Sequence, residues 1–207
     1  MFLNSYHQFE ASKLDDACAL YHRQLPENLK WDSDQFEFAW KRHPPSYDTV
    51  VIHGRPVKIP RFQQAYDRDY QFSGQTSISI PLPEIFQPLL DWARNSVYSE
   101  FNGVLLTWYD GALGHYIGAH RDKTNGLVSG APILTISFGE TRTFRFRPWK
   151  GKGFSDFEAA DGSVFLVPWD TNKTWTHEIT KSKKACGKRI SITIRAFENS
   201  PARREKC

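Results

Sequence analysis

A series of short apolar runs in the second half of the chain constrains its fold more than any other feature. Each run is rich in β-branched or aromatic residues, and Gly, Asp or Pro separates one run from the next. The runs cover residues 104–109, 133–138, 141–147, 163–167 and 189–195. Regular short strands without intervening helices are typical of an all-β sandwich or jelly roll. In 141–147 the strict alternation predicts a strand whose polar side faces solvent.

The first half of the chain has a different pattern. Residues 12–25 place apolar side chains near a helical period, with Ser12 as a plausible cap, and predict an amphipathic helix. Residues 84–98 repeat this pattern and predict a second helix. Residues 49–53 and 56–59 flank a Gly-Arg pair and predict a hairpin. The expected fold class is therefore mainly β (α+β), with helices packed on one outer face.

Length and composition indicate one structural domain. The 207 residues are 40% hydrophobic and 24% charged, which is a globular composition, and no apolar run approaches the length of a membrane span. We expect residues 101–199 to form the core. Residues 1–100 would pack helices and hairpins on it, and residues 200–207 would form a flexible tail. We expect a monomer.

Cysteine usage and the start of the chain indicate the compartment. Cys18, Cys186 and Cys207 are odd in number and far apart, and the first residues lack the basic and apolar regions of a secretory signal. We therefore expect a reducing compartment, namely the cytoplasm, or the nucleus in a eukaryote.

The net charge of +4 is unevenly distributed. Residues 1–103 hold 10 Lys and Arg against 13 Asp and Glu, whereas residues 104–207 hold 17 against 10. Basic residues interleaved with aromatic ones suggest a nucleic-acid path along one edge of the barrel. They are Arg142, Phe144, Arg145, Phe146, Arg147, Trp149, Lys150 and Lys152, followed by Lys181, Lys183, Lys184 and Lys188. The alternative is a solvated strand and a charged loop.

Two histidines and one aspartate have the spacing of a metal site. His120 and Asp122 lie two residues apart, so on an extended strand end both side chains point to one face, and His177 follows later. Two imidazoles and one carboxylate leave positions open for substrate and dioxygen, as non-haem Fe(II) oxygenases require. The alternatives are an exposed polar loop and a surface imidazole. Arg189 and Arg195 bracket the last apolar run, where guanidinium groups could hold a carboxylate or could be ordinary charged strand ends.

Several further motifs accompany these residues. They are Phe101-Asn102, Tyr109, Ile117-Gly-Ala-His-Arg-Asp122, Ala131-Pro132-Ile133, Ser137-Phe138-Gly139, Gly162-Ser163, Thr171-Asn172, Trp175 and Arg189-x5-Arg195. With them, residues 101–197 resemble the catalytic core of the AlkB family of Fe(II)/2-oxoglutarate dioxygenases, which oxidatively dealkylate nucleic-acid bases. Upstream, Pro60-Arg61-x-Gln63 and Tyr70-Gln71-Phe72-Ser73-Gly74 resemble the nucleotide-recognition lid of that family.

The resemblance implies a double-stranded β-helix (jelly roll) and a set of site residues. His120, Asp122 and His177 would ligate Fe(II). Tyr109 and Arg189 would meet the distal carboxylate of the co-substrate 2-oxoglutarate, and Arg195 would lie near its metal-side end. Arg61, Tyr70, Phe72 and Ser73 would contact the flipped base of alkylated DNA or RNA. Dioxygen would complete the reaction, in which 2-oxoglutarate is decarboxylated and an N-alkyl group is hydroxylated and lost.

The chain departs from the family pattern at several positions. Thr107 and Ser191 replace asparagines at the co-substrate, Asp67 stands where Gly is usual, and Thr124 lies near the position of an acid in base-demethylating members. One residue is also inserted between Tyr109 and the first histidine. The departures at 67 and 124 motivate an alternative, the same oxygenase chemistry on a small molecule or a protein side chain. A third hypothesis is a jelly-roll binding module without turnover.

Overall fold

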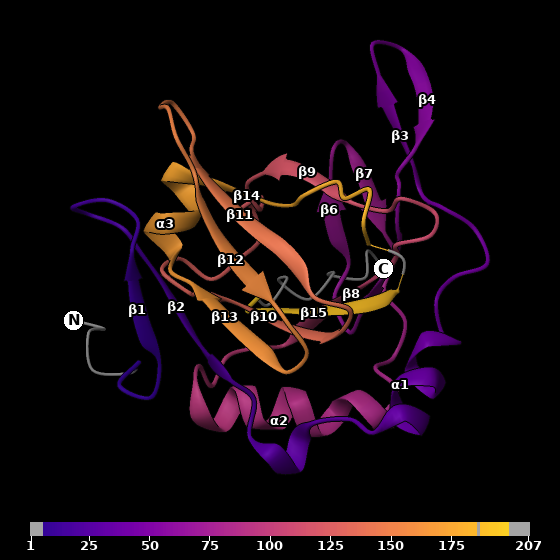
Figure 1. Cartoon of the computed structure of the whole chain (residues 1–207), viewed down its shortest axis with the longest axis horizontal. Coiled ribbons are helices and arrows are strands. Elements are labelled where there is room, and N and C mark those ends of the chain that lie inside the picture. Colours follow the sequence, from indigo (N-terminus) through magenta and orange to yellow (C-terminus); the bar gives the residue numbers. More distant parts are fainter. Residues whose placement is uncertain (1–5, 186, 199–207) are drawn as a thin grey trace, which may run out of the picture.

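Two antiparallel sheets form the body of the molecule (Figure 1). The computed structural model describes residues 6–185 and 187–198. The larger sheet contains, in spatial order, β1 (Glu10–Lys13), β2 (Ala19–Gln24), β13 (Ser163–Val167), β10 (Ile133–Gly139), β15 (Lys188–Arg195), β8 (Gly103–Asp110) and β5 (Phe62–Tyr66). The smaller sheet contains β12 (Ser155–Ala159), β11 (Arg142–Pro148), β14 (Trp175–Ile179) and β9 (Ile117–His120). All five apolar runs form strands, and the expected jelly roll is confirmed.

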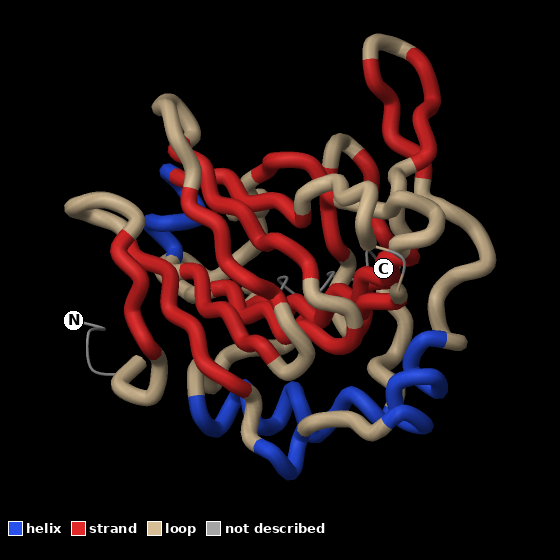
Figure 2. The backbone as a smooth tube through the Cα atoms, viewed as in Figure 1, coloured by secondary structure: helices blue, strands red, loops and turns tan. Residues whose placement is uncertain are grey.

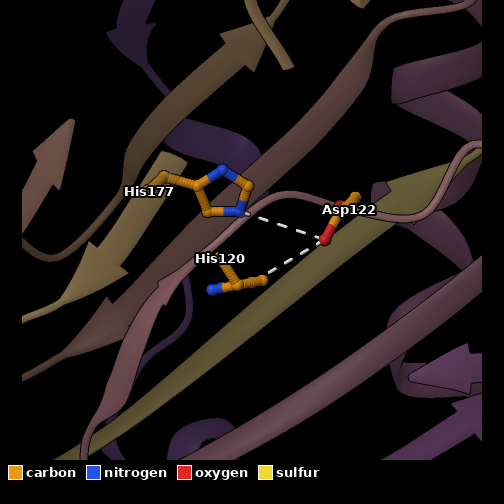
Figure 3. A group of neighbouring side chains, drawn as sticks. All are labelled: His120, Asp122 and His177. Atoms are coloured by element: carbon orange, nitrogen blue, oxygen red, sulfur yellow. Dashed lines mark ion pairs between the residues drawn. The ribbon is translucent and has the colours of Figure 1, made fainter. Parts of the chain in front are cut away.

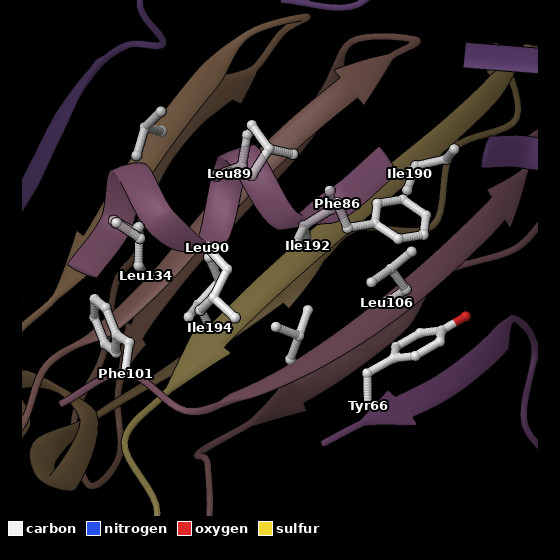
Figure 4. Close-up of a cluster of buried hydrophobic side chains, with 14 of the residues drawn as sticks. Tyr66, Phe86, Leu89, Leu90, Phe101, Leu106, Leu134, Ile190, Ile192 and Ile194 are labelled. Carbon is white, nitrogen blue, oxygen red and sulfur yellow. The ribbon is translucent and has the colours of Figure 1, made fainter. Parts of the chain in front are cut away.

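The central strands of the larger sheet are buried on both faces, whereas its edge strand β1 is mostly exposed. On β8 the outward side chains Leu106 and Trp108 belong to one core cluster. Figure 4 shows Leu106 in this cluster together with Leu89 and Leu90 of helix α2 (Gln87–Ser96). Helix α1 (Ser33–Trp40) packs on the same side, and the two helices follow one edge of the molecule in Figure 2. The inward face meets the smaller sheet. This arrangement leaves the inward positions of β8, β10 and β15 available for a site.

The N-terminal segment contradicts the helix predicted over residues 12–25. It forms the β1–β2 hairpin, and β2 adds to the large sheet beside β13. Ser12 does not cap a helix, because its Oγ lies 2.8 Å from Nε2 of His22 across the hairpin. Asp15 instead closes the turn, where its Oδ1 accepts from the backbone N–H groups of Ala17 and Cys18. For this short segment, the hydrogen bonds and packing gained by pairing with the edge of the sheet stabilise a strand more than the helical spacing of apolar residues stabilises a helix.

The other helices differ from expectation in smaller ways. The segment 84–98 is helical as predicted, with a 3-10 turn η2 (Glu84–Phe86) that leads into α2. Helix α1 was not predicted, although Asp32 and Gln35 form a reciprocal capping box at its start. Helix α3 (Trp169–Thr174) was not predicted either. A short 3-10 turn η1 (Glu27–Leu29) follows β2.

The basic path proposed along 141–147 is wrong for Arg142, which lies on the apolar side of the alternation. This side chain is 3% exposed and lies on the buried face of β11, where Nη2 donates to the carbonyls of His115 and Thr180. Arg145 and Arg147 lie on the other face, but Asp156 and Glu178 pair with them. Lys188, at the start of β15, pairs with Glu37 of α1. The proposed basic path is therefore shorter than the sequence indicated.

Two hairpins stand apart from the sheets. The β3–β4 hairpin (Thr49–Ile52 and Arg55–Lys58) confirms the predicted turn and projects away from the body in Figure 1. The β6–β7 hairpin (Tyr70–Phe72 and Gln75–Ser77) turns through Ser73 and Gly74, both at positive φ. Asp67 also has a positive φ of 60°, which explains why Gly is usual there; its Oδ1 accepts from the N–H of Leu82.

No helix within residues 6–185 and 187–198 is long and apolar enough to cross a membrane. The tail predicted over residues 200–207, together with Cys186 and Cys207, lies outside the described residues.

Candidate metal and co-substrate site

The three predicted metal ligands meet where the smaller sheet faces the larger one. His120 ends β9 and His177 lies opposite it on β14, so the strand pairing itself brings the two imidazoles together. Asp122 follows two residues after β9. Its Oδ1 lies 3.7 Å from Nε2 of His120 and 3.9 Å from Nε2 of His177. Figure 3 shows both rings pointing toward this carboxylate, and the ligand atoms lie within 4.8 Å of one another.

The protonation of the three side chains suits a divalent cation. Burial lowers the pKa of His177 to about 3 and also lowers the pKa of His120, so both rings are neutral at pH 7. Nδ1 of His120 donates to the carbonyl of Gly118, which leaves Nε2 with its lone pair toward Asp122. Burial would raise the pKa of Asp122, but the charge of Arg195, the two neighbouring histidines and the hydrogen bonds from Arg195 together outweigh burial and keep the pKa below its ordinary value. The residues therefore fit a two-histidine, one-carboxylate Fe(II) centre.

Two neighbours fix the position of Asp122. Nε and Nη2 of Arg195 donate to Oδ2 at 3.0 and 2.7 Å, so Oδ1 is the oxygen that faces the histidines. Asn172 of α3 accepts from the N–H of Asp122 and donates to its carbonyl, both at 3.0 Å. Asn172 was part of a sequence motif but was not among the predicted site residues. No helix was predicted over this segment, so the position of Asn172 beside Asp122 was not expected.

The sequence model of the 2OG-Fe(II) oxygenase superfamily matches residues 6–195. The chain belongs to this superfamily. Its members use Fe(II), 2-oxoglutarate and dioxygen, the cofactors predicted from the sequence, and His120, Asp122 and His177 supply the metal-binding triad.

Relatives of the oxygenase confirm the resemblance to the AlkB family. It is 31% identical over 157 residues to DNA oxidative demethylase ALKBH2 of Homo sapiens, covering 70% of this chain and 60% of that protein. It is 26% identical over 210 residues to the ALKBH2 of Arabidopsis thaliana, covering 84% and 64%. The matched region thus spans less than two thirds of each relative. The solved structure of OsALKBH1 has the same fold, with a TM-score of 0.58 at 13% identity over 91% of this chain and 100% of that one.

A cavity of about 600 Å³ opens beside the triad of the oxygenase. Thr107 and Tyr109 of β8 and Ser191 of β15 line it, and Ser191 pairs directly with Thr107. Arg195 lines the cavity at the metal, where we expected it. The small hydroxyl side chains at 107 and 191 leave room where the family carries asparagines.

Arg189 lies at the far end of β15 from Arg195, paired with Tyr109 across the strands. Its guanidinium is 5.0 Å from the Tyr109 ring and donates to Oγ of Ser137. Arg189 is 1% exposed, and its Nε and Nη1 have no hydrogen-bond partner among the described residues. Burial lowers the pKa of Arg189 to about 10, so the side chain is cationic at pH 7. Unpaired guanidinium nitrogens in a buried position can bind a carboxylate. Ser137 contributes here although it was not predicted.

The four predicted substrate-binding residues line the same cavity. Arg61 precedes β5, and Tyr70, Phe72 and Ser73 belong to the β6–β7 hairpin. The rings of Tyr70 and Phe72 are nearly parallel, and the guanidinium of Arg195 lies 4.4 Å from the Tyr70 ring. The hydroxyl of Tyr70 donates to Oδ1 of Asp122 at 3.2 Å. The fold therefore brings the hairpin into direct contact with the triad.

Proposed function

We propose that the oxygenase oxidatively dealkylates N-alkylated bases in DNA or RNA. The observation that carries this proposal is the position of the β6–β7 hairpin, whose Tyr70 and Phe72 rings wall the cavity directly above the triad. A volume of about 600 Å³ accommodates the co-substrate together with one flipped base. Aromatic rings beside a reactive centre are suited to holding a planar base by stacking.

The surface around the triad supports a nucleic-acid substrate. A shallow groove outside His120 is lined by Arg121, Lys123, Lys173 and Trp149. The guanidinium of Arg121 lies 4.2 Å from the ring of Trp149, which is half exposed. Cationic groups neutralise phosphates, and an exposed indole offers a face for an unpaired base. The relatives described as DNA oxidative demethylases favour the same substrate class.

The residues of the chain position the reactants. When bound, Fe(II) with 2-oxoglutarate and dioxygen supplies the oxidising power that hydroxylates a C–H bond. Arg195 holds Asp122 in its ligating orientation, while Arg189 and Tyr109 would receive the distal carboxylate of 2-oxoglutarate. Tyr70 and Phe72 would hold the base so that its N-alkyl carbon faces the metal. The hydroxylated N-alkyl group then leaves as an aldehyde, which restores the base.

Two observations are consistent with the alternative substrate, a small molecule or a protein side chain. Position 124 carries Thr and not an acid, and Arg145 and Arg147 are paired with carboxylates. Both are consistent with oxidation of a small molecule or a protein side chain by the same centre.

Methylated oligonucleotides provide the test. The iron-loaded protein should remove one methyl group from such an oligonucleotide, detected by mass, and release formaldehyde and succinate in equal amounts. The same reaction with Asp122→Ala is the control. Succinate release without any dealkylation would favour the small-molecule or protein hydroxylase, and absence of both would favour the binding module.

A monomeric state and a cytoplasmic or nuclear location stay predictions, to be measured by light scattering and by fractionation of the source cells.

A further inference from the structure

The charges that line the cavity are strongly unbalanced. Arg61, Arg121, Lys123 and Arg195 are cationic, and Asp122 is the one acidic residue among the described residues that line it. Asp122 is already engaged by Arg195. Burial lowers the pKa of Arg61, and Asp48 lies near enough to oppose this shift in part, but Asp48 does not line the cavity. The charges of Fe(II) and the 2-oxoglutarate dianion cancel, so the loaded cavity remains cationic.

This balance bears on which alkylated bases the cavity accepts. Alkylation at N1 of adenine or N3 of cytosine produces a cationic base, whereas alkylation at N3 of thymine or uracil leaves the base neutral. A cationic base would enter a partly buried site that already holds unpaired positive charge, which is unfavourable. An acid beside the triad could offset that cost, but Lys123 and Thr124 occupy this segment.

Two buried donors in the cavity wall lack acceptors. Gln63 is 4% exposed, and its Nε2 has no hydrogen-bond partner in the part of the chain that the structure describes. The same holds for Nε of Arg61, two residues earlier. Residues two apart on an extended chain share a face, and both line the cavity. Buried donors require acceptors. The two carbonyl oxygens that flank N3 of thymine or uracil are acceptors of this kind. N3-alkylcytosine has one such carbonyl beside N3, and N1-alkyladenine has none.

We propose that the cavity selects neutral bases with carbonyl acceptors, N3-alkylated thymine or uracil, over cationic N1-alkyladenine and N3-alkylcytosine. Gln63 is the specificity-determining donor, and Arg61 acts beside it. This inference rests on the proposed dealkylation of nucleic acids and narrows its substrate class.

The first test compares oligonucleotides that differ only in the central base, which is 3-methylthymine, 3-methylcytosine or 1-methyladenine. Single-turnover rates of methyl loss should be about tenfold to a hundredfold higher for 3-methylthymine, the range expected when a buried donor gains or lacks its acceptor. This comparison uses the unmodified protein, so it remains decisive if a variant fails to fold.

The second test changes the donor. Gln63→Glu replaces a donor by an anionic acceptor, so the ratio of rates should shift toward the cationic bases, by about tenfold or more. Gln64→Glu is the matched control: Gln64 lies next on the same strand, faces away from the cavity and donates to the carbonyls of Ala65 and Ile78. It should leave the ratio unchanged. A ratio of rates does not depend on how much of the enzyme is folded.

The outcomes separate the two proposals. Dealkylation that favours cationic bases, or a ratio that Gln63→Glu does not move, overturns this inference and leaves nucleic-acid dealkylation intact. Absence of dealkylation on every base, with normal succinate release, removes the proposed function and the inference with it.

Discussion

The two ends of the cavity differ in how completely their polar groups are paired. At the metal end, Asp122 has a partner for each polar atom: Tyr70 for Oδ1, Arg195 for Oδ2 and Asn172 for the backbone N–H and carbonyl. Nδ1 of His177 is the exception at this end, because no described residue pairs with it. At the other end, Gln63 has an unpaired Nε2, and Arg189, which lies behind the cavity wall beside Tyr109, has two unpaired nitrogens. Both regions are buried.

This difference indicates which polar groups of the site have partners within the protein and which need a bound ligand. The carboxylate of Asp122 is held in one position before any ligand binds, which favours catalysis because little reorganisation remains. The other end leaves donors unsatisfied, and a bound carboxylate or carbonyl would satisfy them. Substitutions at the two ends should therefore have different signatures: loss of stability together with function at the metal end, and loss of binding alone at the other.

The largest effect is expected for Asp122→Ala. The change removes one metal ligand and leaves Arg195 buried without its partner, which costs about 3–5 kcal/mol in the free energy of unfolding. Activity should be abolished. Titration calorimetry with Mn(II) and urea denaturation measure the two losses. Asp156→Ala, which breaks a surface pair with Arg145, is the control and should cost about 0–1 kcal/mol. Wild-type turnover of 2-oxoglutarate in Asp122→Ala would show that the triad is wrongly assigned.

Arg189→Ala comes next, and it should separate binding from stability. Loss of a charge-assisted contact should weaken 2-oxoglutarate binding by about 2–5 kcal/mol. The free energy of unfolding should fall far less than in Asp122→Ala, because Ser137 is the one described side chain that accepts from the guanidinium. Arg189→Lys should recover little, since an ammonium cannot form the bidentate contact.

Calorimetry of 2-oxoglutarate binding, followed by urea denaturation of the same samples, tests the prediction for Arg189. An unchanged affinity in Arg189→Ala would move the carboxylate anchor elsewhere, with Arg195 as the next candidate.

Asn172→Ala should have an intermediate effect at the metal end. Both hydrogen bonds to the backbone of Asp122 disappear, so the carboxylate loses its fixed position although every ligand remains. We expect about a 10- to 100-fold weaker Mn(II) affinity, as for other groups that orient metal ligands. Asp170→Ala, at an exposed position of the same helix, should leave the affinity unchanged. Equal effects of the two variants would mean that α3 as a whole, and not Asn172, supports the triad.

The parts of this design that the sequence predicted are those with a local signature. The five apolar runs became strands because their alternation and turn residues agree with the final sheet. His120 and Asp122 were predictable because two positions on an extended strand share a face. Arg189 and Arg195, six residues apart on β15, share a face for the same reason; Arg195 lines the cavity, and Arg189 lies beside Tyr109, which also lines it.

The parts that the sequence did not predict depend on contacts distant in the chain. Residues 12–25 have a helical period but pair with β13, about 140 residues later, so local pattern gave the wrong element. Arg142 was expected on the basic path, but it lies on the buried face of β11, where it donates to the carbonyls of His115 and Thr180. The sequence could not predict that Nε2 of Gln63 lacks a hydrogen-bond partner, because this depends on which residues surround it in the fold. The start of helix α1, in contrast, has a local signature, because Asp32 and Gln35 have the spacing of a capping box, but we did not predict a helix there.

The smallest effect is expected on the surface, where the same distinction between paired and unpaired groups applies. Lys183 and Lys184 form no ion pair with the described residues, whereas Arg145 is held by a bidentate pair with Asp156. If the lysines contact phosphates, Lys183→Glu and Lys184→Glu should each weaken oligonucleotide binding and lower its salt dependence by about one charge. Arg145→Ala should change neither. Fluorescence anisotropy across a salt series measures both quantities, and 2-oxoglutarate turnover without substrate should stay constant. Binding that is independent of salt, or equal effects of the substitutions at 145 and 183, would show that these lysines are solvated and do not contact phosphates. The groove lined by Arg121 and Trp149 would then be the next candidate for the nucleic-acid path.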